Sequence, residues 1–203
     1  MSDKLEQILT LVKDYISEKR QSHEWIAGED WVQYSGPHYD ELEYEAAIKS
    51  LLSEWLVFGK ECRNFELEFP KLLGKKLGVL TNSGSSANLL MMSSLTSNKK
   101  NLGKYHLPEG SKILTPIVCF PTTLNPILQC GYKPVFIDVD LPSLNLNLDQ
   151  MEEMLKADTN KEIKAVIFAH VLGNPPNMDR FMALVEEYDL IFLEDACDAL
   201  GST

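Results

Sequence analysis

One stretch decides the fold: Ala165-Val166-Ile167-Phe168-Ala169 is almost wholly apolar, as a strand that is buried on both faces must be. A second apolar run, Leu190–Leu193, ends in Glu194-Asp195, and a helix predicted over 179–188 lies between the two runs. Strands of this kind that alternate with helices are typical of a mostly parallel sheet with helices on both faces. The predicted fold class is therefore α/β, with three α/β/α layers.

Periodicity and capping residues predict the remaining elements. Residues 20–38 contain two tryptophans, glycines and a proline, which is typical of an extended arm with turns. Capping boxes are expected at Asp3 with Glu6 and at Asp40 with Glu43, each at the start of a helix. The expected helices cover 3–18, a stretch from about Asp40 through Trp55, 65–77 with an interruption at Pro70, Leu89 to Leu95, a stretch after Pro121, and 147–157, and short strands are expected at 79–81, 113–115 and 135–138.

This order of elements divides the chain into a helix and arm over 1–38 and a domain over 39–203. The arm could pack on another subunit or cover its own core, and both interpretations stay open. The chain stops at Gly201-Ser202-Thr203, directly after a predicted strand, where a doubly wound domain would continue. We therefore expect a truncated domain.

Composition excludes several classes of protein. The 203 residues, 44% apolar and 24% charged, are ordinary for one globular domain. A net charge of −11 argues against a nucleic-acid partner, because phosphate binding needs a clustered positive surface. The sequence shows neither a signal peptide nor an apolar run that could span a membrane. Four scattered cysteines predict no metal site but buried free thiols in a reducing cytoplasm (Cys62, Cys119, Cys130 and Cys197).

Ligands of parallel α/β sheets bind beyond the carboxyl ends of the strands, so the residues after each strand are the candidate site. Ser83-Gly84-Ser85-Ser86 stands at a predicted strand-to-helix turn, where unpaired N–H groups and the helix dipole favour a phosphate. Plain N-capping by serine is the alternative. Neither a dinucleotide fingerprint nor a Walker loop is present.

Two further positions have unusual chemistry. Phe120, just before Pro121, could present its ring to a flat ligand, although core packing is the alternative. Asp195 ends a buried apolar strand, which is costly without a partner; a protonated pyridine nitrogen would be such a partner, with a salt bridge or helix cap as alternatives. A phosphate-type turn, then a flat ring, then a strand-terminal Asp is what a pyridoxal phosphate pocket requires.

Several motifs together resemble the DegT-like sugar aminotransferase family, and in particular its branch that contains CDP-4-keto-6-deoxyglucose 3-dehydrase. The resemblance covers residues 31–203. It implies the large domain of aspartate-aminotransferase-type enzymes and a homodimer with active sites at the subunit interface. The motifs are Thr81–Leu89, Phe120–Pro126, Val135–Asp140, Ala169–Pro175 and Glu194–Gly201.

The resemblance also implies roles for single residues. Ser85 and Ser86, beside Gly84, would hold the phosphate of pyridoxal 5'-phosphate (PLP) or pyridoxamine 5'-phosphate (PMP), and Phe120 would stack on its ring. Asp195 would pair with the ring nitrogen as the catalytic residue in this part of the chain. Asp198 would lie near the ring hydroxyl, where most aminotransferases of the family have Gln. His170 fits a family motif, but we assign it no chemical role.

The resemblance places the deciding residue about two dozen positions after Asp195, beyond Thr203. A lysine there would bind the cofactor covalently and favour an aminotransferase; a histidine would favour a 3-dehydrase that binds PMP freely. Asp198 favours C3 dehydration of a nucleotide-linked 4-keto-6-deoxysugar, for deoxysugar or lipopolysaccharide synthesis. The alternatives are a sugar-nucleotide aminotransferase and a non-catalytic half-domain. Some relatives need a reductase partner, and some hold an iron–sulfur cluster at cysteines that would lie beyond Thr203. The sequence does not decide whether either applies here.

Overall fold

The computed structural model describes residues 3–21, 24–32, 36, 39–97, 102–141 and 143–202. The chain divides into two compact units, residues 1–80 (unit 1) and 81–203 (unit 2). The expected division after residue 38 stays a prediction, and each unit is described by itself.

Unit 1 is helical, with α1 (Asp3–Gln21), α2 (Glu41–Leu52) and α3 (Lys60–Leu72). The capping box at α2 is confirmed: the Asp40 side chain accepts from the Leu42 N–H, and Glu43 accepts from the Asp40 N–H. Asp3 and Glu6 both lie in the first turn of α1. A salt bridge of 2.6 Å between Lys13 and Glu45 joins α1 to α2.

The bounds predicted for the third helix, 65–77, are wrong. The helix starts at Lys60 after an extended Gly59, and it includes Pro70 within its last turn rather than breaking there. It ends at Leu72, because Gly74 takes a left-handed conformation (φ +64°) that closes the helix. The arm predicted over 20–38 lies partly outside the described residues. Its described part contains a turn, in which the N–H groups of Glu29 and Asp30 donate to the Ile26 carbonyl.

Unit 2 contains a parallel sheet in the order β2-β1-β5-β6, which confirms the α/β prediction. A two-stranded antiparallel pair, β3 (Val139–Asp140) with β4 (Asn145–Leu146), and two 3-10 turns at Gly103–Tyr105 and Val171–Gly173 were not predicted. The other elements are α4 (Gly84–Ser94), β1 (Lys112–Pro116), α6 (Pro121–Gln129), β2 (Lys133–Ile137), α7 (Leu148–Ala157), β5 (Ile163–Ala169), α8 (Met178–Glu187) and β6 (Ile191–Asp195).

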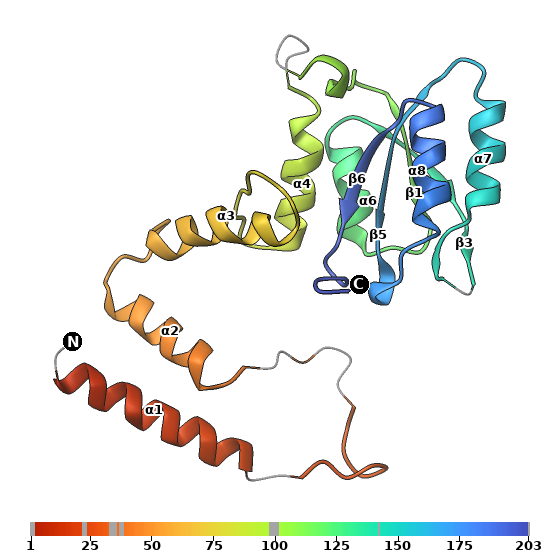
Figure 1. Cartoon of the computed structure of the whole chain (residues 1–203). Helices are drawn as coiled ribbons and strands as arrows, with labels where there is room; N and C mark the ends of the chain where they lie inside the picture. Colours follow the sequence, from red (N-terminus) through yellow and green to blue (C-terminus); the bar gives the residue numbers. More distant parts are fainter. Residues whose placement is uncertain are drawn as a thin grey trace. The chain divides into compact units, whose positions relative to one another are not determined.

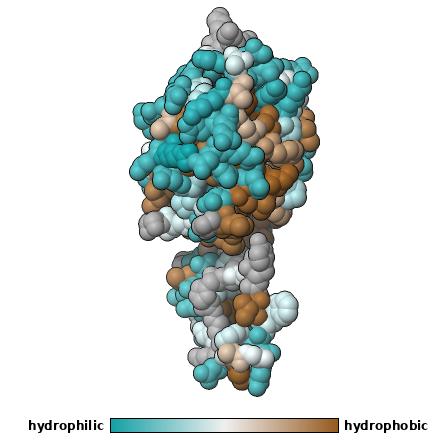
Figure 2. Space-filling view, turned by 90° about the vertical axis from the view of Figure 1, so that its right-hand side faces the viewer, coloured by the Kyte–Doolittle hydropathy of each residue, from teal (hydrophilic) through white to brown (hydrophobic). Residues whose placement is uncertain are grey.

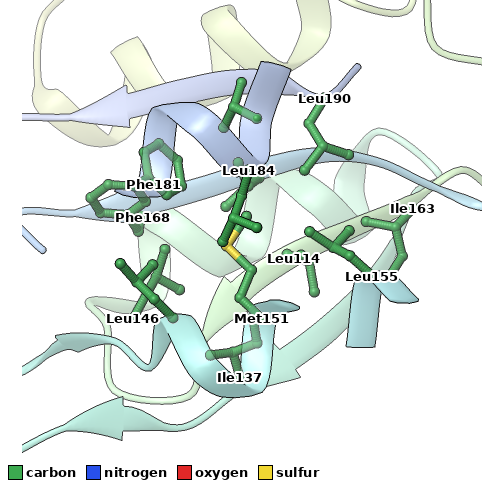
Figure 3. Packing of buried hydrophobic residues seen from close by; sticks show 13 residues of the cluster. Leu114, Ile137, Leu146, Met151, Leu155, Ile163, Phe168, Phe181, Leu184 and Leu190 are labelled. Atoms are coloured by element: carbon green, nitrogen blue, oxygen red, sulfur yellow. The ribbon is translucent and has the colours of Figure 1, made fainter. Parts of the chain in front are cut away.

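Helices cover the sheet of unit 2 on both faces, as the three-layer prediction requires (Figure 1). On one face α7 and α8 pack against β1, β2 and β5, with Phe168 and Met151 fully buried (Figure 3). On the other face α4 and α6 pack through Met92 and Ile127 against Ile113 and Ala165. The two inner strands of the sheet, β1 and β5, contribute side chains to both clusters.

The strand predicted at 79–81 is wrong. A strand needs a neighbour that accepts its backbone hydrogen bonds, but the Leu80 N–H donates to the Glu66 side chain at 2.8 Å. Val79 is 73% exposed, so the short apolar run is not buried as a central strand would be. In the described residues, this segment instead runs as an irregular connection into α4.

The topology places a ligand edge at the carboxyl ends of the four strands. From β1 the chain crosses to β2 on one side and then returns to β5 on the other, so the order reverses between β1 and β5. Ligands of open α/β sheets bind beyond such a switch point. Pro116 pairs with Ile137 and Ala169 pairs with Asp195, so the loops after these residues meet at one edge.

Apolar side chains also remain on the surface of the molecule (Figure 2). In unit 2 several of them stand in the loops that follow the strands: Ile117, Val118, Phe120, Leu172 and Leu200. Unit 1 exposes others, among them Trp31, Trp55 and Leu72. None of the described helices is both long enough and apolar enough to cross a bilayer.

Candidate cofactor site

The carboxylate of Asp195 lies at the end of β6, half-buried, with donors on both oxygens. Its Oδ2 accepts from Asn88 Nδ2 at 2.8 Å and from Thr123 Oγ1 at 2.9 Å, and its Oδ1 accepts from the Cys197 N–H at 3.2 Å. The bond to Cys197 closes a turn directly after β6; no helix starts there in the described residues, so the helix-cap alternative finds no support. The described part of the chain provides no salt-bridge partner for this carboxylate, so the salt-bridge alternative finds no support there.

Asn88 and Thr123 are site residues to which the sequence analysis assigned no role. Asn88 lies in the second turn of α4 and is 6% exposed; Thr123 lies in the first turn of α6 and is fully buried. Both are polar side chains that are buried near the start of a helix. Because a buried polar group needs a hydrogen-bond partner, this position is the signal that could have identified them. Their shared partner is Asp195.

The start of α4 faces the same region. Ser83 caps the helix, its hydroxyl accepting from the Ser86 N–H at 3.2 Å, so the capping alternative holds for Ser83. The N–H groups of Gly84 and Ser85 have no acceptor among the described residues, and they can therefore bind an anion. A Cβ on Gly84 would lie 3.6 Å from the Cys197 sulfur, which places this helix start beside the loop that follows Asp195.

Phe120 is 68% exposed and precedes Pro121, the first residue of α6. The alternative that Phe120 packs in the core is therefore wrong, and its ring is available to a ligand. Cys119, the preceding residue, is half-buried, and burial together with the negative charge of Asp195 raises the pKa of its thiol. The loop after β1 thus lies within electrostatic reach of the carboxylate at the end of β6.

The raised pKa of Cys119 makes this proximity measurable. Because the thiolate is the reactive form, alkylation of Cys119 by iodoacetamide should reach half its maximal rate at a higher pH than alkylation of an ordinary thiol. Asp195→Asn removes one of the charges that oppose the thiolate, so the midpoint should move to lower pH. Mass spectrometry of the modified peptide gives the rate, with Cys62 in unit 1 as the internal control. An unchanged Cys119 midpoint in Asp195→Asn would contradict the proximity.

The remaining residues of interest are less tightly held. Asp198 is exposed, and its side chain has no partner among the described residues, so its expected place near a ring hydroxyl stays a prediction. His170 is buried and its Nε2 lies 2.8 Å from Glu194 Oε1, which agrees with a hydrogen-bonding role in the loop. The four cysteines are all free. Cys197 is exposed and the other three are half-buried, so the expectation of buried thiols is wrong. No group of three potential metal ligands occurs in the described residues.

Two curated proteins are similar to nearly the whole chain. A dTDP-4-dehydro-2,6-dideoxy-D-glucose 3-dehydratase from Saccharopolyspora spinosa is 40% identical over 201 residues, 99% of this chain and 42% of that protein. The lipopolysaccharide biosynthesis protein RfbH from Salmonella typhimurium is 38% identical over 202 residues, 98% of this chain and 44% of that protein. The chain therefore spans less than half the length of these relatives.

Solved structures share the fold. The GDP-4-keto-6-deoxy-D-mannose-3-dehydratase of E. coli, with bound hydrated PLP, is 35% identical with a TM-score of 0.73, over 83% of this chain and 41% of that one. PseC of Helicobacter pylori, an aminotransferase of pseudoaminic acid biosynthesis, is 27% identical with a TM-score of 0.72, over 84% of this chain and 43% of that one. The model of the DegT/DnrJ/EryC1/StrS aminotransferase family matches residues 17–203. The chain belongs to this family.

Proposed function

We propose that this chain forms the PLP- or PMP-binding part of an enzyme that removes the C3 hydroxyl of a nucleotide-linked 4-keto-6-deoxysugar. One observation carries the proposal: the carboxylate of Asp195 is hydrogen-bonded to Asn88 of α4, the helix whose first turn offers unpaired N–H groups. A carboxylate and an anion site held by one helix fit a ligand with a cationic ring and a phosphate.

Each part of the site then has a role. The N–H groups of Gly84 and Ser85, with the hydroxyls of Ser85 and Ser86, bind the phosphate, and exposed Phe120 stacks on the ring. Asp195 accepts a hydrogen bond from the protonated ring nitrogen and so keeps that nitrogen charged. The bound cofactor supplies an electron-accepting ring for the reaction. Asp198, three residues further on, binds near the ring hydroxyl.

Dehydration is preferred because the two 3-dehydratases share higher identity with this chain, 40% and 35%, than the aminotransferase PseC, at 27%. The similarity to PseC keeps the transfer of an amino group as the second candidate. Incubation of the whole enzyme that contains this chain with PMP and a CDP-, dTDP- or GDP-linked 4-keto-6-deoxysugar separates them. Loss of the C3 hydroxyl supports dehydration, whereas a sugar with an amino group at C4 and regenerated PLP supports transfer.

The exposed apolar loops after the strands support a homodimer in which a second subunit covers this edge. The product would enter deoxysugar or lipopolysaccharide synthesis in the cytoplasm. A reductase would be needed only where the dehydrated product is reduced further.

Binding of PMP tests the cofactor part of the proposal and the alternative of a non-catalytic half-domain. Calorimetry of the purified chain should give a micromolar dissociation constant (Kd) for PMP. Ser85→Asp places a negative charge at the helix start and should raise this Kd by at least about tenfold, the size of one charge-assisted hydrogen bond. Pyridoxamine, which lacks the phosphate, should bind equally to both proteins.

The matched control is Ser94→Asp, the same change at the exposed far end of α4, which should leave the Kd for PMP within about twofold because helix-dipole effects are confined to the terminal turns. Absence of PMP binding to the unaltered chain would favour the non-catalytic alternative. Equal losses in the two variants would place the phosphate elsewhere.

A further inference from the structure

We infer that Asn88 and Thr123 are positioning residues that hold Oδ2 of Asp195 and leave Oδ1 to meet the ring nitrogen of the cofactor. The inference rests on the proposed function and extends it to two residues that do not touch the cofactor themselves. Both residues are at most 6% exposed, and they come from different helices, α4 and α6. Their convergence on one oxygen atom of Asp195 is the observation to be explained.

The orientation of the Asn88 amide follows from its partners. Its nitrogen lies 2.8 Å from Asp195 Oδ2 and 3.3 Å from the carbonyl oxygen of Thr122, and both of these atoms accept hydrogen bonds. Only the NH₂ group can donate to both, so the amide oxygen cannot take its place. Asn88 is therefore a fixed donor to Asp195.

Thr123 supplies the second donor. Its hydroxyl lies 2.9 Å from the same Oδ2, and its backbone N–H donates to the Phe120 carbonyl at 2.9 Å. An oxygen that already accepts two hydrogen bonds has both lone pairs occupied, so Oδ2 is the protein-facing atom of the carboxylate. Oδ1 accepts one backbone N–H, from Cys197 at 3.2 Å, and it has a lone pair left for a further donor.

The arrangement gives helix α4 two tasks. Its first turn, at Gly84 and Ser85, carries the unpaired N–H groups for the phosphate, and its second turn, at Asn88, orients the carboxylate for the ring. Because an α-helix rises 1.5 Å per residue, the phosphate site and the orienting amide are separated by a fixed length. A ligand with a phosphate and a ring nitrogen at the matching separation is then selected by one rigid element.

Thr123→Val tests the inference, because valine has nearly the shape of threonine but no donor, whereas Thr123→Ser keeps the donor. We expect Thr123→Val to raise the Kd for PMP about five- to tenfold, as the loss of one hydrogen bond that orients the carboxylate would, and Thr123→Ser to stay within about twofold of the unaltered chain. Asn88→Leu, on the other helix, should give a loss at least as large. Circular dichroism melting identifies any variant that does not fold, and the other variant then decides.

A second ligand separates positioning from general damage. The 1-deaza analogue of PMP has carbon in place of the ring nitrogen, so its Kd should be the same for Thr123→Val, Thr123→Ser and the unaltered chain. An unchanged Kd for PMP in the folded Thr123→Val and Asn88→Leu variants would overturn the inference, and so would equal losses of PMP and the deaza analogue. If the unaltered chain failed to bind PMP, the proposed function itself would fail.

Discussion

Asp195→Asn should weaken PMP binding by about 30- to 160-fold, which corresponds to the 2–3 kcal/mol of a charge-assisted hydrogen bond. The hydrogen-bond network makes the physical reason specific. Asn88 and Thr123 donate to the position of Oδ2, so the new amide must turn its oxygen toward them. Its NH₂ group then takes the position of Oδ1, where it faces the Cys197 N–H and cannot accept a hydrogen bond from the ring nitrogen.

Titration calorimetry measures this loss, and the neighbouring residue provides the control. Glu194→Gln makes the same carboxylate-to-amide change one residue earlier, at a side chain that is 48% exposed and pairs with His170. Its Kd for PMP should stay within about twofold of the unaltered value, because a half-exposed pair contributes little. Equal affinities of Asp195→Asn and the unaltered chain would remove Asp195 from the cofactor site.

Phe168→Ala should lower the free energy of unfolding of unit 2 by about 3–5 kcal/mol, the usual cost of removing a buried aromatic side chain. Phe168 is fully buried in β5, stacked on Phe192 at 5.2 Å between ring centroids and in edge contact with Phe181 at 5.1 Å. The cavity left by alanine would lie between the sheet and α8. A loss of this size is a large share of the roughly 5–15 kcal/mol that stabilises a typical protein.

The measurement must report on unit 2. All three tryptophans, Trp25, Trp31 and Trp55, lie in unit 1, so tryptophan fluorescence does not follow the change. Amide hydrogen exchange of strand β5 does follow it. Phe120→Ala is the matched control, because its ring is 68% exposed and its loss should change stability by less than about 0.5 kcal/mol. A loss below about 1 kcal/mol in Phe168→Ala would contradict the packing.

The sheet was predictable where burial imposes a pattern on the sequence. β5 and β6 are continuous apolar runs because both faces of each strand are covered. The start of helix α2, directly after its N-cap Asp40, was predictable because a capping box is a local signal. The segment 79–81 is equally apolar, yet it has no neighbouring strand in the described residues, and no local pattern reveals a missing neighbour. The two-residue strands of the β3–β4 pair are too short for periodicity to reveal.

The candidate site was likewise predictable only where the sequence carries a local signal. Asp195 and the Ser83–Ser86 turn were identified because each follows an apolar run and carries chemistry that the run does not explain. The partners of Asp195 were not identified, because Asn88 and Thr123 are 107 and 72 residues away from it along the chain. Such pairs are created by the packing of α4 and α6 beside β6, and a single sequence does not contain that packing.

The ring nitrogen of bound PMP is the most direct test of the central claim, that Asp195 holds a cationic ring in a site anchored at the start of α4. The ¹⁵N NMR chemical shift of PMP labelled at this nitrogen distinguishes a protonated from a neutral ring. At neutral pH we expect a protonated nitrogen on the unaltered chain and a neutral one on Asp195→Asn, whose amide can only donate at that position. A neutral nitrogen on the unaltered chain, with PMP bound, would contradict the account.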